Sequence, residues 1–387
     1  MKKELWLIFL IAFIDLLGFG IVIPTLPFIA EHFGASALQI GILAGSYSLF
    51  QFIGSPILGR LSDKYGRKPL LSLSLFGTSA GYFLIAVAGS LPLVFLSRVI
   101  DGLTGGNISV AQAYIADVTE GKERTKAMGL LGSAFGMGFI FGPLIGAVLT
   151  PYGFALPYIF AGILAFLNGL LIMIILPESE RKTTQQRVGS LFSVKVLKEI
   201  LRPQIVLDLT ILFFLITFSF SLMQGIFPLY TNRLFRWDAR HNGYFFAFIG
   251  VVSVLSQGVV LRRLVHKISE RTIVRIALFS LTIGFTIFTF GKTQLLFFLG
   301  GLFLASSFGI LNASIQAEIS HFSNPEEQGI VMGVVQGWSA LARAIGPVVG
   351  GLLFGSLFLQ APFLLSAILL FVSALISLTI YKKSNLE

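Results

Sequence analysis

The 387-residue chain has no cysteine, four histidines and only 12% charged residues. Without cysteine there can be no disulfide, thiolate nucleophile or iron–sulfur site, and the histidines (32, 241, 266 and 321) are too scattered for metal-ligand spacing. We therefore expect no metal, no cofactor and no enzymatic activity. Soluble domains carry about a quarter charged residues, so the scarcity of charge excludes an ordinary soluble domain and indicates a membrane protein.

Apolar sequence is what the chain has in abundance. Hydrophobic residues make up 55% of it, and stretches such as 7–23 and 362–380 are apolar on every side, unlike the alternating strands of a spanning β-barrel. A spanning helix needs about 20 apolar residues, and we predict an all-α membrane protein with twelve transmembrane helices. The predicted spans are 5–30, 38–58, 70–88, 92–114, 127–149, 156–176, 205–230, 242–261, 272–290, 293–316, 329–354 and 362–381.

The basic residues indicate the orientation in the membrane. With the N-terminus inside, cytoplasmic segments hold 22 of the 28 Lys and Arg residues, and external loops hold only Arg233, Arg236, Arg240 and Lys292. This bias predicts a multi-pass protein of the cell membrane with both termini in the cytoplasm. The net charge of +10 is explained by basic residues in the cytoplasmic loops rather than by a surface that binds phosphates, so we expect no nucleic-acid partner. The sequence gives no role to the three external arginines.

The two halves of the sequence repeat at a shift of 204 residues. Gly142-Pro143-x-x-Gly146 matches Gly346-Pro347-x-x-Gly350, and the segment from Gln112 matches the segment from Gln316. Such a same-sense repeat predicts two six-helix bundles, 1–177 and 205–387, with a substrate site near the membrane midplane. The linker 178–204 includes an amphipathic stretch, 190–202, which is either a helix on the inner leaflet or a flexible connection.

The loop between spans two and three carries the first motif, Gly59-Arg-Leu-Ser-Asp63-Lys-Tyr-Gly66-Arg67-Lys-Pro69. Its glycines allow a tight reversal, and Asp63 and Arg67 are spaced for a local ion pair. The loop resembles the signature G-x-L-x-D-x-x-G-R-K of the major facilitator superfamily, whose fold is two six-helix bundles. That resemblance implies a conformational switch that latches the two halves at the cytoplasmic face. Its residues here are Gly59, Asp63, Gly66, Arg67 and Asp117, the acid that ends the fourth span.

Span five carries the second motif, a row of glycines at four-residue steps that ends in the Gly-Pro-x-x-Gly sequence. Small residues let helices approach closely, and the internal proline bends the helix. The predicted packing and hinge residues are Gly138, Gly142, Pro143 and Gly146, with Gly346, Pro347 and Gly350 in the second half. The motif resembles that of the twelve-span drug/proton antiporters, and segments 98–107, 112–117 and 129–146 are similar to their tetracycline-resistance-like branch.

The third feature is charge inside predicted spans. Asp15 lies in span one, and Arg98 and Asp101 lie in span four, at depths where each charge costs about 2.5–3.5 kcal/mol. Burial favours the protonated form of a carboxylate, and pairing with an arginine favours the ionised form. We therefore expect these three residues to couple transport to the movement of a proton. The alternative is a static ion pair that joins spans one and four. By resemblance, Asp15 and Arg98 match the first-span and fourth-span motifs of the exporters.

Polar and aromatic residues in later positions are candidates for substrate binding. Arg343 either binds an anionic substrate or satisfies carbonyl groups freed near Pro347. The candidates are Asn107, Gln112, Gln224, Asn312, Gln316, Trp338 and Arg343. We predict a monomeric secondary transporter that exports small, largely apolar compounds by alternating access with the proton as coupling ion. The alternatives are a transporter of a lipid, sugar or organic anion with Arg343 as ligand, and a membrane receptor or scaffold that does not transport.

Overall fold

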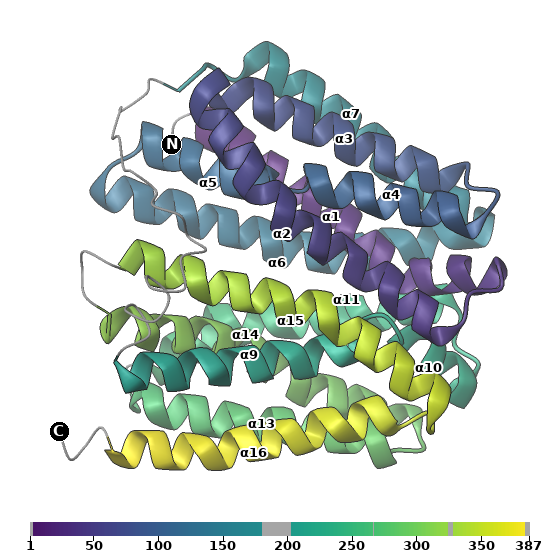
Figure 1. Ribbon diagram of the computed structural model, residues 1–387, viewed down its shortest axis with the longest axis vertical. Helices are drawn as coiled ribbons and strands as arrows, with labels where there is room; N and C mark the ends of the chain where they lie inside the picture. Colours follow the sequence, from purple (N-terminus) through teal and green to yellow (C-terminus); the bar gives the residue numbers. More distant parts are fainter. Residues whose placement is uncertain (1–2, 180–202, 266, 324–327, 384–387) are drawn as a thin grey trace. The chain divides into compact units, whose positions relative to one another are not determined.

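The computed structural model describes residues 3–179, 203–265, 267–323 and 328–383, and their regular elements are helices (Figure 1). Eleven of these helices are long and apolar enough to cross a membrane. The predicted fourth span is instead a pair of consecutive helices, α4 (Leu91–Thr104) and α5 (Asn107–Val118). The predicted interfacial helix at 190–202 lies outside the described residues.

By their contacts, the helices form two compact units, each treated separately below. Unit 1 consists of the described residues within Met1–Thr184 and Gly225–Gly250, and unit 2 of those within Gln185–Gln224 and Val251–Glu387. Unit 1 thus includes a segment from the second half of the sequence. The reason is visible in α11, where Gly243 and Gly250 allow its backbone to approach α6 around Pro143 and Phe139.

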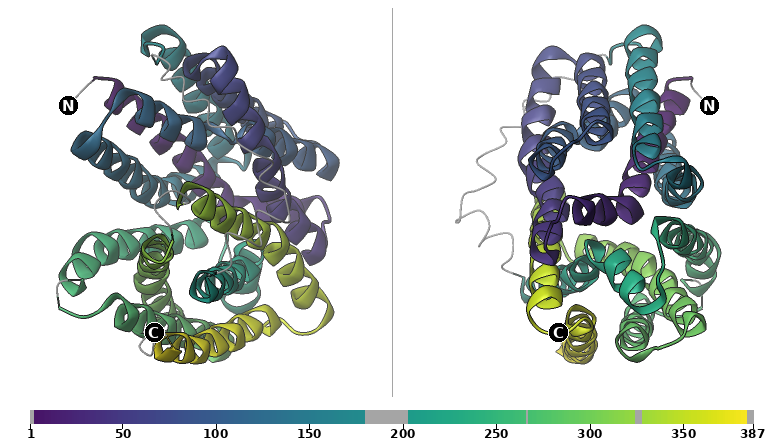
Figure 2. Two further views of the ribbon diagram at one scale, coloured as in Figure 1. Left: turned by 60° about the vertical axis from the view of Figure 1, so that its left-hand side comes forward. Right: turned by 90° about the vertical axis from the view of Figure 1, so that its right-hand side faces the viewer.

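Unit 1 is built on two long helix pairs, α1 beside α6 and α3 beside α7 (Figures 1 and 2). Its core is a cluster of aliphatic residues and Tyr114 contributed by α1, α2, α3, α5, α6 and α7. The helices are α1 (Lys3–His32), α2 (Ala37–Tyr65), α3 (Arg67–Ala86), α4, α5, α6 (Gly121–Leu149), η1 (Thr150–Tyr152), α7 (Ala155–Ile175), α10 (Phe227–Phe235) and most of α11 (Ala239–Leu255).

Unit 2 pairs α13 with α14 and α9 with α15, and α16 covers α9 and α13. The second-half span that begins with α11 continues through a π-helix, η2 (Ser256–Leu261), into α12 (Arg262–Leu264). The other helices are α9 (Gln204–Gln224), α13 (Glu270–Phe290), α14 (Gln294–His321), α15 (Gln328–Ser356) and α16 (Ala361–Lys383).

The repeat seen in the sequence is also present in the helix packing. A Cβ atom added to Gly142 of α6 would lie 2.5 Å from the Leu17 carbonyl oxygen of α1, and one added to Gly346 of α15 would lie 2.6 Å from Ser221 Cβ of α9. Leu17 and Ser221 are themselves related by the shift of 204 residues. The matching glycines therefore bring equivalent helices into close contact in each unit.

Candidate functional site

The buried charges of unit 1 lie within one group of polar side chains. Asp15, Arg98 and Asp101 are 6%, 1% and 3% exposed. Arg98 Nη1 lies 3.0 Å from Asp101 Oδ2, an ion pair within α4. Asn107, the first residue of α5, is fully buried, and its Nδ2 donates to Asp15 Oδ1 at 2.7 Å. The two carboxyl groups thus have different partners, one a cation and the other a neutral amide.

This arrangement differs from the static ion pair between spans one and four that was the alternative to proton coupling. The ion pair does not join spans one and four, since both of its members belong to α4; the link from α1 to the fourth span is the bond between Asp15 and Asn107. In the described part of the chain, Asp15 makes no ion pair. Its carboxyl group can therefore gain or lose a proton without breaking a salt bridge.

Arg98 keeps two donors without a hydrogen-bond partner among the described residues, Nε and Nη2. Its guanidinium lies 5.9 Å from the ring centroids of both Tyr47 and Tyr82, and these rings supply cation–π attraction in a site with little access to water. Arg98 is thus held by Asp101 and by the two tyrosine rings, and two of its N–H groups remain available. These groups can donate to an oxygen atom of a bound substrate or to a carboxylate that has lost its proton.

The break in the predicted fourth span positions Asn107. Helix α4 ends at Thr104 and α5 begins at Asn107, so Gly105 and Gly106 interrupt the helix beside the buried charges. Gln51 of α2 donates from Nε2 to the freed carbonyl oxygen of Gly105 at 2.9 Å and to the Tyr47 hydroxyl at 3.0 Å. Sequence reasoning missed Gln51; the available signal was a carboxamide in the middle of a predicted span.

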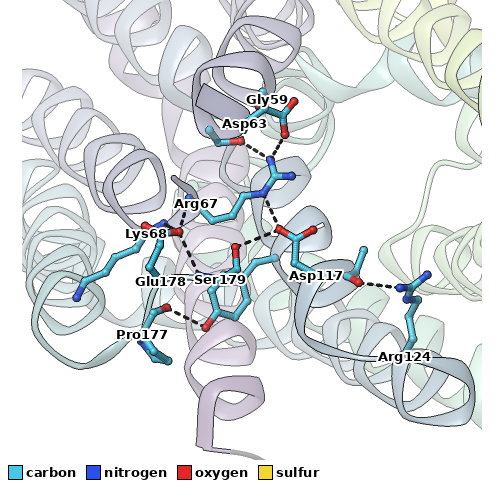
Figure 3. A network of polar contacts seen from close by, with 12 residues as sticks. Gly59, Asp63, Arg67, Lys68, Asp117, Arg124, Pro177, Glu178 and Ser179 are labelled. Atoms are coloured by element: carbon cyan, nitrogen blue, oxygen red, sulfur yellow. Dashed lines mark hydrogen bonds and ion pairs between the residues drawn. The ribbon is translucent and has the colours of Figure 1, made fainter. Parts of the chain in front are cut away.

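A second polar group lies where α2 turns into α3, and Figure 3 shows it. Arg67 Nη1 lies 2.6 Å from Asp63 Oδ1, and Arg67 Nε lies 3.0 Å from Asp117 Oδ2 at the end of α5. Arg67 Nη1 also donates to Ser62 Oγ, whose hydroxyl donates to the Gly59 carbonyl oxygen. The structure thus brings together the residues predicted for the switch, and their role in switching stays a prediction.

The same group contains two residues that the sequence did not single out, Glu178 and Ser179. Glu178 Oε1 accepts from the backbone amides of Arg67 at 2.7 Å and Lys68 at 3.3 Å, so it satisfies the free amides at the start of α3. Ser179 Oγ donates to Asp117 Oδ2 at 3.1 Å. The signal available was an acid directly after span six, but its partners lie more than one hundred residues away in the sequence.

Gly66 leaves the space that the Glu178 carboxylate needs to reach the backbone amides of Arg67 and Lys68. Its φ of +105° is unfavourable for other residues, and an added Cβ would overlap the Glu178 carboxylate. The Tyr114 hydroxyl fixes the segment that carries Glu178 by donating to the Pro177 carbonyl oxygen at 3.0 Å. The turn, the end of α7 and the end of α5 are therefore held as one network around Arg67 (Figure 3).

Replacing Glu178 by alanine should lower the stability of the protein by about 1–2 kcal/mol, because the amides at the start of α3 lose their charged acceptor. Glu178→Gln keeps an acceptor oxygen without the charge, so its loss should be about half as large. Thermal unfolding of the purified full chain measures both variants. Equal stability of wild type and Glu178→Ala would contradict this account of the network.

The predicted packing residues lie at helix contacts. An added Cβ would lie 2.5 Å from Leu16 Cβ at Gly138 and 3.6 Å from Ile21 Cα at Gly146, so α6 approaches α1 closely along several turns. In unit 2, an added Cβ at Gly350 would overlap the Leu222 carbonyl oxygen of α9. Pro143 and Pro347 lie inside α6 and α15.

The remaining substrate candidates are divided between the two units. Gln112 is exposed on α5 of unit 1, and Gln224 is the half-buried last residue of α9. In unit 2, Asn312 Nδ2 donates to the Phe308 carbonyl oxygen at 3.1 Å, and Gln316 accepts from Gln336 Nε2 at 3.0 Å. Two further candidates lie on α15: Trp338 packs edge-on against Phe214, and Arg343 Nη1 donates to Ser339 Oγ at 2.6 Å.

The external arginines have individual structural surroundings. Arg233 Nη2 pairs with Glu31 Oε1 at 3.0 Å, Arg236 ends α10 in a left-handed conformation, and Arg240 donates to the Tyr244 hydroxyl at 3.2 Å. Asp238, which precedes α11, accepts from the backbone N–H of His241. Burial opposes ionisation of Asp238, but the hydrogen bonds and charge of His241 outweigh it and hold the pKa of Asp238 below its usual value.

Repeated helical units, charged residues buried in the spans and broken helices beside them define a polytopic membrane protein of the secondary-transporter type. Sequence comparison supports this class and makes it specific. The family model of the Major Facilitator Superfamily matches residues 8–294 and 260–386. The chain therefore belongs to the Major Facilitator Superfamily and is a transporter of small molecules rather than an enzyme.

Three relatives illustrate the range of this similarity. The chain is 31% identical to the class D tetracycline resistance protein of Salmonella ordonez, over 92% of this chain and 90% of that protein. It is 28% identical to multidrug resistance protein 2 of Bacillus subtilis, over 96% and 94%. The crystal structure of the human organic anion transporter MFSD10 matches with a TM-score of 0.73 and 25% identity, over 97% of this chain and all of that one.

Proposed function

We propose that this transporter exports small, largely apolar compounds in exchange for protons. The observation that supports the proposal most directly is the buried group of Asp15, Asn107, Arg98 and Asp101. In this group the carboxyl group of Asp15 accepts a hydrogen bond from a neutral amide, and that of Asp101 forms an ion pair with Arg98. Relatives named for tetracycline and multidrug resistance support export, and the bias of basic residues supports cytoplasmic termini.

In the proposed cycle, a proton from outside binds Asp15 or Asp101 and favours the inward-facing state. Protonation of Asp101 weakens its pairing with Arg98. Protonation of Asp15 removes the negative charge from the acceptor of the Asn107 amide and so weakens that hydrogen bond. Binding of the substrate favours release of the proton to the cytoplasm. One charge that crosses about 100 mV supplies roughly 2.3 kcal/mol, enough for about a fiftyfold gradient of substrate.

The switch network has a place in this cycle. We assign it to the cytoplasmic face, where the Arg67 bonds to Asp63 and Asp117 would hold one state and release it in the other. Because three acidic or hydroxyl partners share a single guanidinium, loss of one bond lowers the cost of losing the next.

Transport by purified protein in proteoliposomes tests the function. With an acidic lumen, tetracycline should accumulate inside the vesicles, and nigericin, which collapses the proton gradient, should stop the accumulation. Protein-free vesicles are the control, since weak acids and bases distribute with pH by themselves. Accumulation that is unchanged by nigericin would overturn proton coupling.

A second candidate function is the transport of organic anions. Arg343 is a half-buried cation within α15, and the MFSD10 structure is that of an organic anion transporter. Under this alternative, Arg343→Ala should weaken the binding of fluorescein, an anionic probe, by about tenfold to a hundredfold because a charged hydrogen bond is lost. Arg343→Lys should keep part of the affinity. Binding of fluorescein that does not depend on Arg343 would exclude this role.

A further inference from the structure

Gln257 is a carboxamide within a predicted membrane span, and neither its sequence position nor the buried charge group explains it. It belongs to the π-helix η2, inside the span Ala239–Leu264, and its side chain is exposed. In the described part of the protein its carboxamide makes no hydrogen bond. An exposed amide that faced lipid would leave its donors and acceptor unsatisfied, so such groups face the interior of a bundle or a water-filled path. Single-turn π-helices are also frequent at functional sites.

The helix opposite leaves room for this side chain. Gly309 of α14 has no side chain, and a Cβ atom there would overlap the carboxamide of Gln257. Gly309 is the equivalent of Gly105 at the shift of 204 residues, and Gly105 likewise lies beside a glutamine, Gln51. In unit 1 that glutamine is bonded to the Gly105 carbonyl oxygen and to Tyr47. Each of the two equivalent glycines thus has a glutamine carboxamide beside it, although Gln51 and Gln257 are not themselves related by the shift. Among the described residues, only the glutamine of unit 1 makes hydrogen bonds.

Two other carboxamides continue the same surface of unit 2. Asn312 and Gln316 follow Gly309 by three and seven residues, a spacing that puts all three on one face of α14. Both are half-buried, and Gln316 shares a bond with Gln336. Beside them, the rings of Phe308 and Phe220 stack with centroids 3.9 Å apart. This face offers hydrogen-bond donors, acceptors and a flat apolar surface, without a charged group among the residues named.

We propose that Gln257 is a further specificity-determining residue, which with Asn312 and Gln316 forms a carboxamide row for the substrate. Each carboxamide donates and accepts without charge. The row therefore selects neutral compounds that carry both carbonyl and hydroxyl or amide groups on an apolar body, in preference to permanent ions. The inference rests on the proposed export function, for which it names the substrate class.

Equilibrium binding to the purified full chain tests the row with two probes. Chloramphenicol is neutral and carries hydroxyl, carbonyl and amide groups, whereas tetraphenylphosphonium is a cation without hydrogen-bonding groups. Gln257→Met keeps the length of the side chain and removes its polar atoms. We expect it to weaken chloramphenicol binding about fivefold to tenfold, the effect of losing one or two hydrogen bonds, and to leave tetraphenylphosphonium binding unchanged.

Two further variants test whether an effect of Gln257→Met reflects the loss of its polar atoms or a general disturbance of the fold. Gly309→Ala, which displaces the Gln257 carboxamide, should give the same selective loss. Gln294→Met, at the other end of α14, should bind chloramphenicol as the wild type does. The proposal is overturned if the wild type does not bind chloramphenicol, if Gln257→Met binds it normally, or if both probes are weakened equally. Binding is measured without a proton gradient, so selective binding combined with nigericin-insensitive transport would refute proton coupling and keep the row.

Discussion

Replacing Asp15 by asparagine should abolish uphill transport and leave the protein folded. An asparagine at this position has nearly the same volume and can still bond with the Asn107 amide, so the contact between α1 and α5 survives. It cannot carry a proton. In vesicles with an acidic lumen, the wild type should accumulate the exported probe against its gradient, whereas the accumulation ratio of Asp15→Asn should be about one.

A second readout separates loss of coupling from loss of transport. Exchange of labelled for unlabelled probe at equal pH needs no net proton movement, so Asp15→Asn should retain this exchange. Asp208→Asn is the matched control. Asp208 lies near the start of α9 and accepts a hydrogen bond from Gln204, and the variant should accumulate the probe as the wild type does. If Asp15→Asn still drove uphill accumulation, Asp15 would not carry the coupling proton.

The distribution of apolar residues was enough to predict most of the fold. Runs of about twenty apolar residues, the glycine motifs and the shift of 204 residues follow directly from sequence order, and the major facilitator fold and the paired packing of Gly142 and Gly346 agree with them. The break at Gly105 and Gly106 was not predicted, because α4 and α5 follow each other so closely that the segment was assigned as one span of suitable length. The π-helix η2 was missed for the same reason: hydropathy does not report hydrogen-bond register.

The sequence was sufficient to predict which charged residues belong to the site, but not which groups they bond to. Asp15, Arg98 and Asp101 stood out because charge is costly inside a membrane. Which carboxylate pairs with Arg98 depends on the rotation of α1 against α4, and the sequence does not contain that angle. Gln51 and Glu178 act on backbone groups of distant segments, and such bonds leave no local pattern.

The largest effect on stability should come from separating Arg98 and Asp101. In Arg98→Met, the buried carboxylate of Asp101 loses its partner, and breaking a buried ion pair by removing one member costs about 3–5 kcal/mol. We expect a matching fall in the free energy of unfolding of the purified full chain, measured by chemical denaturation in detergent.

The double variant Arg98→Met/Asp101→Leu distinguishes stability from function. Replacing a whole buried pair by apolar residues of similar size is often neutral or stabilising, so the double variant should regain most of the lost stability. It should nevertheless show no uphill transport, because both the cation and one of the two candidate proton carriers are gone. If the loss of stability in the double variant equalled the sum of the losses in Arg98→Met and in Asp101→Leu alone, Arg98 and Asp101 would contribute independently. The combination of restored stability and absent transport would instead show that the charges in α4 are kept for coupling, at a cost that apolar packing would avoid.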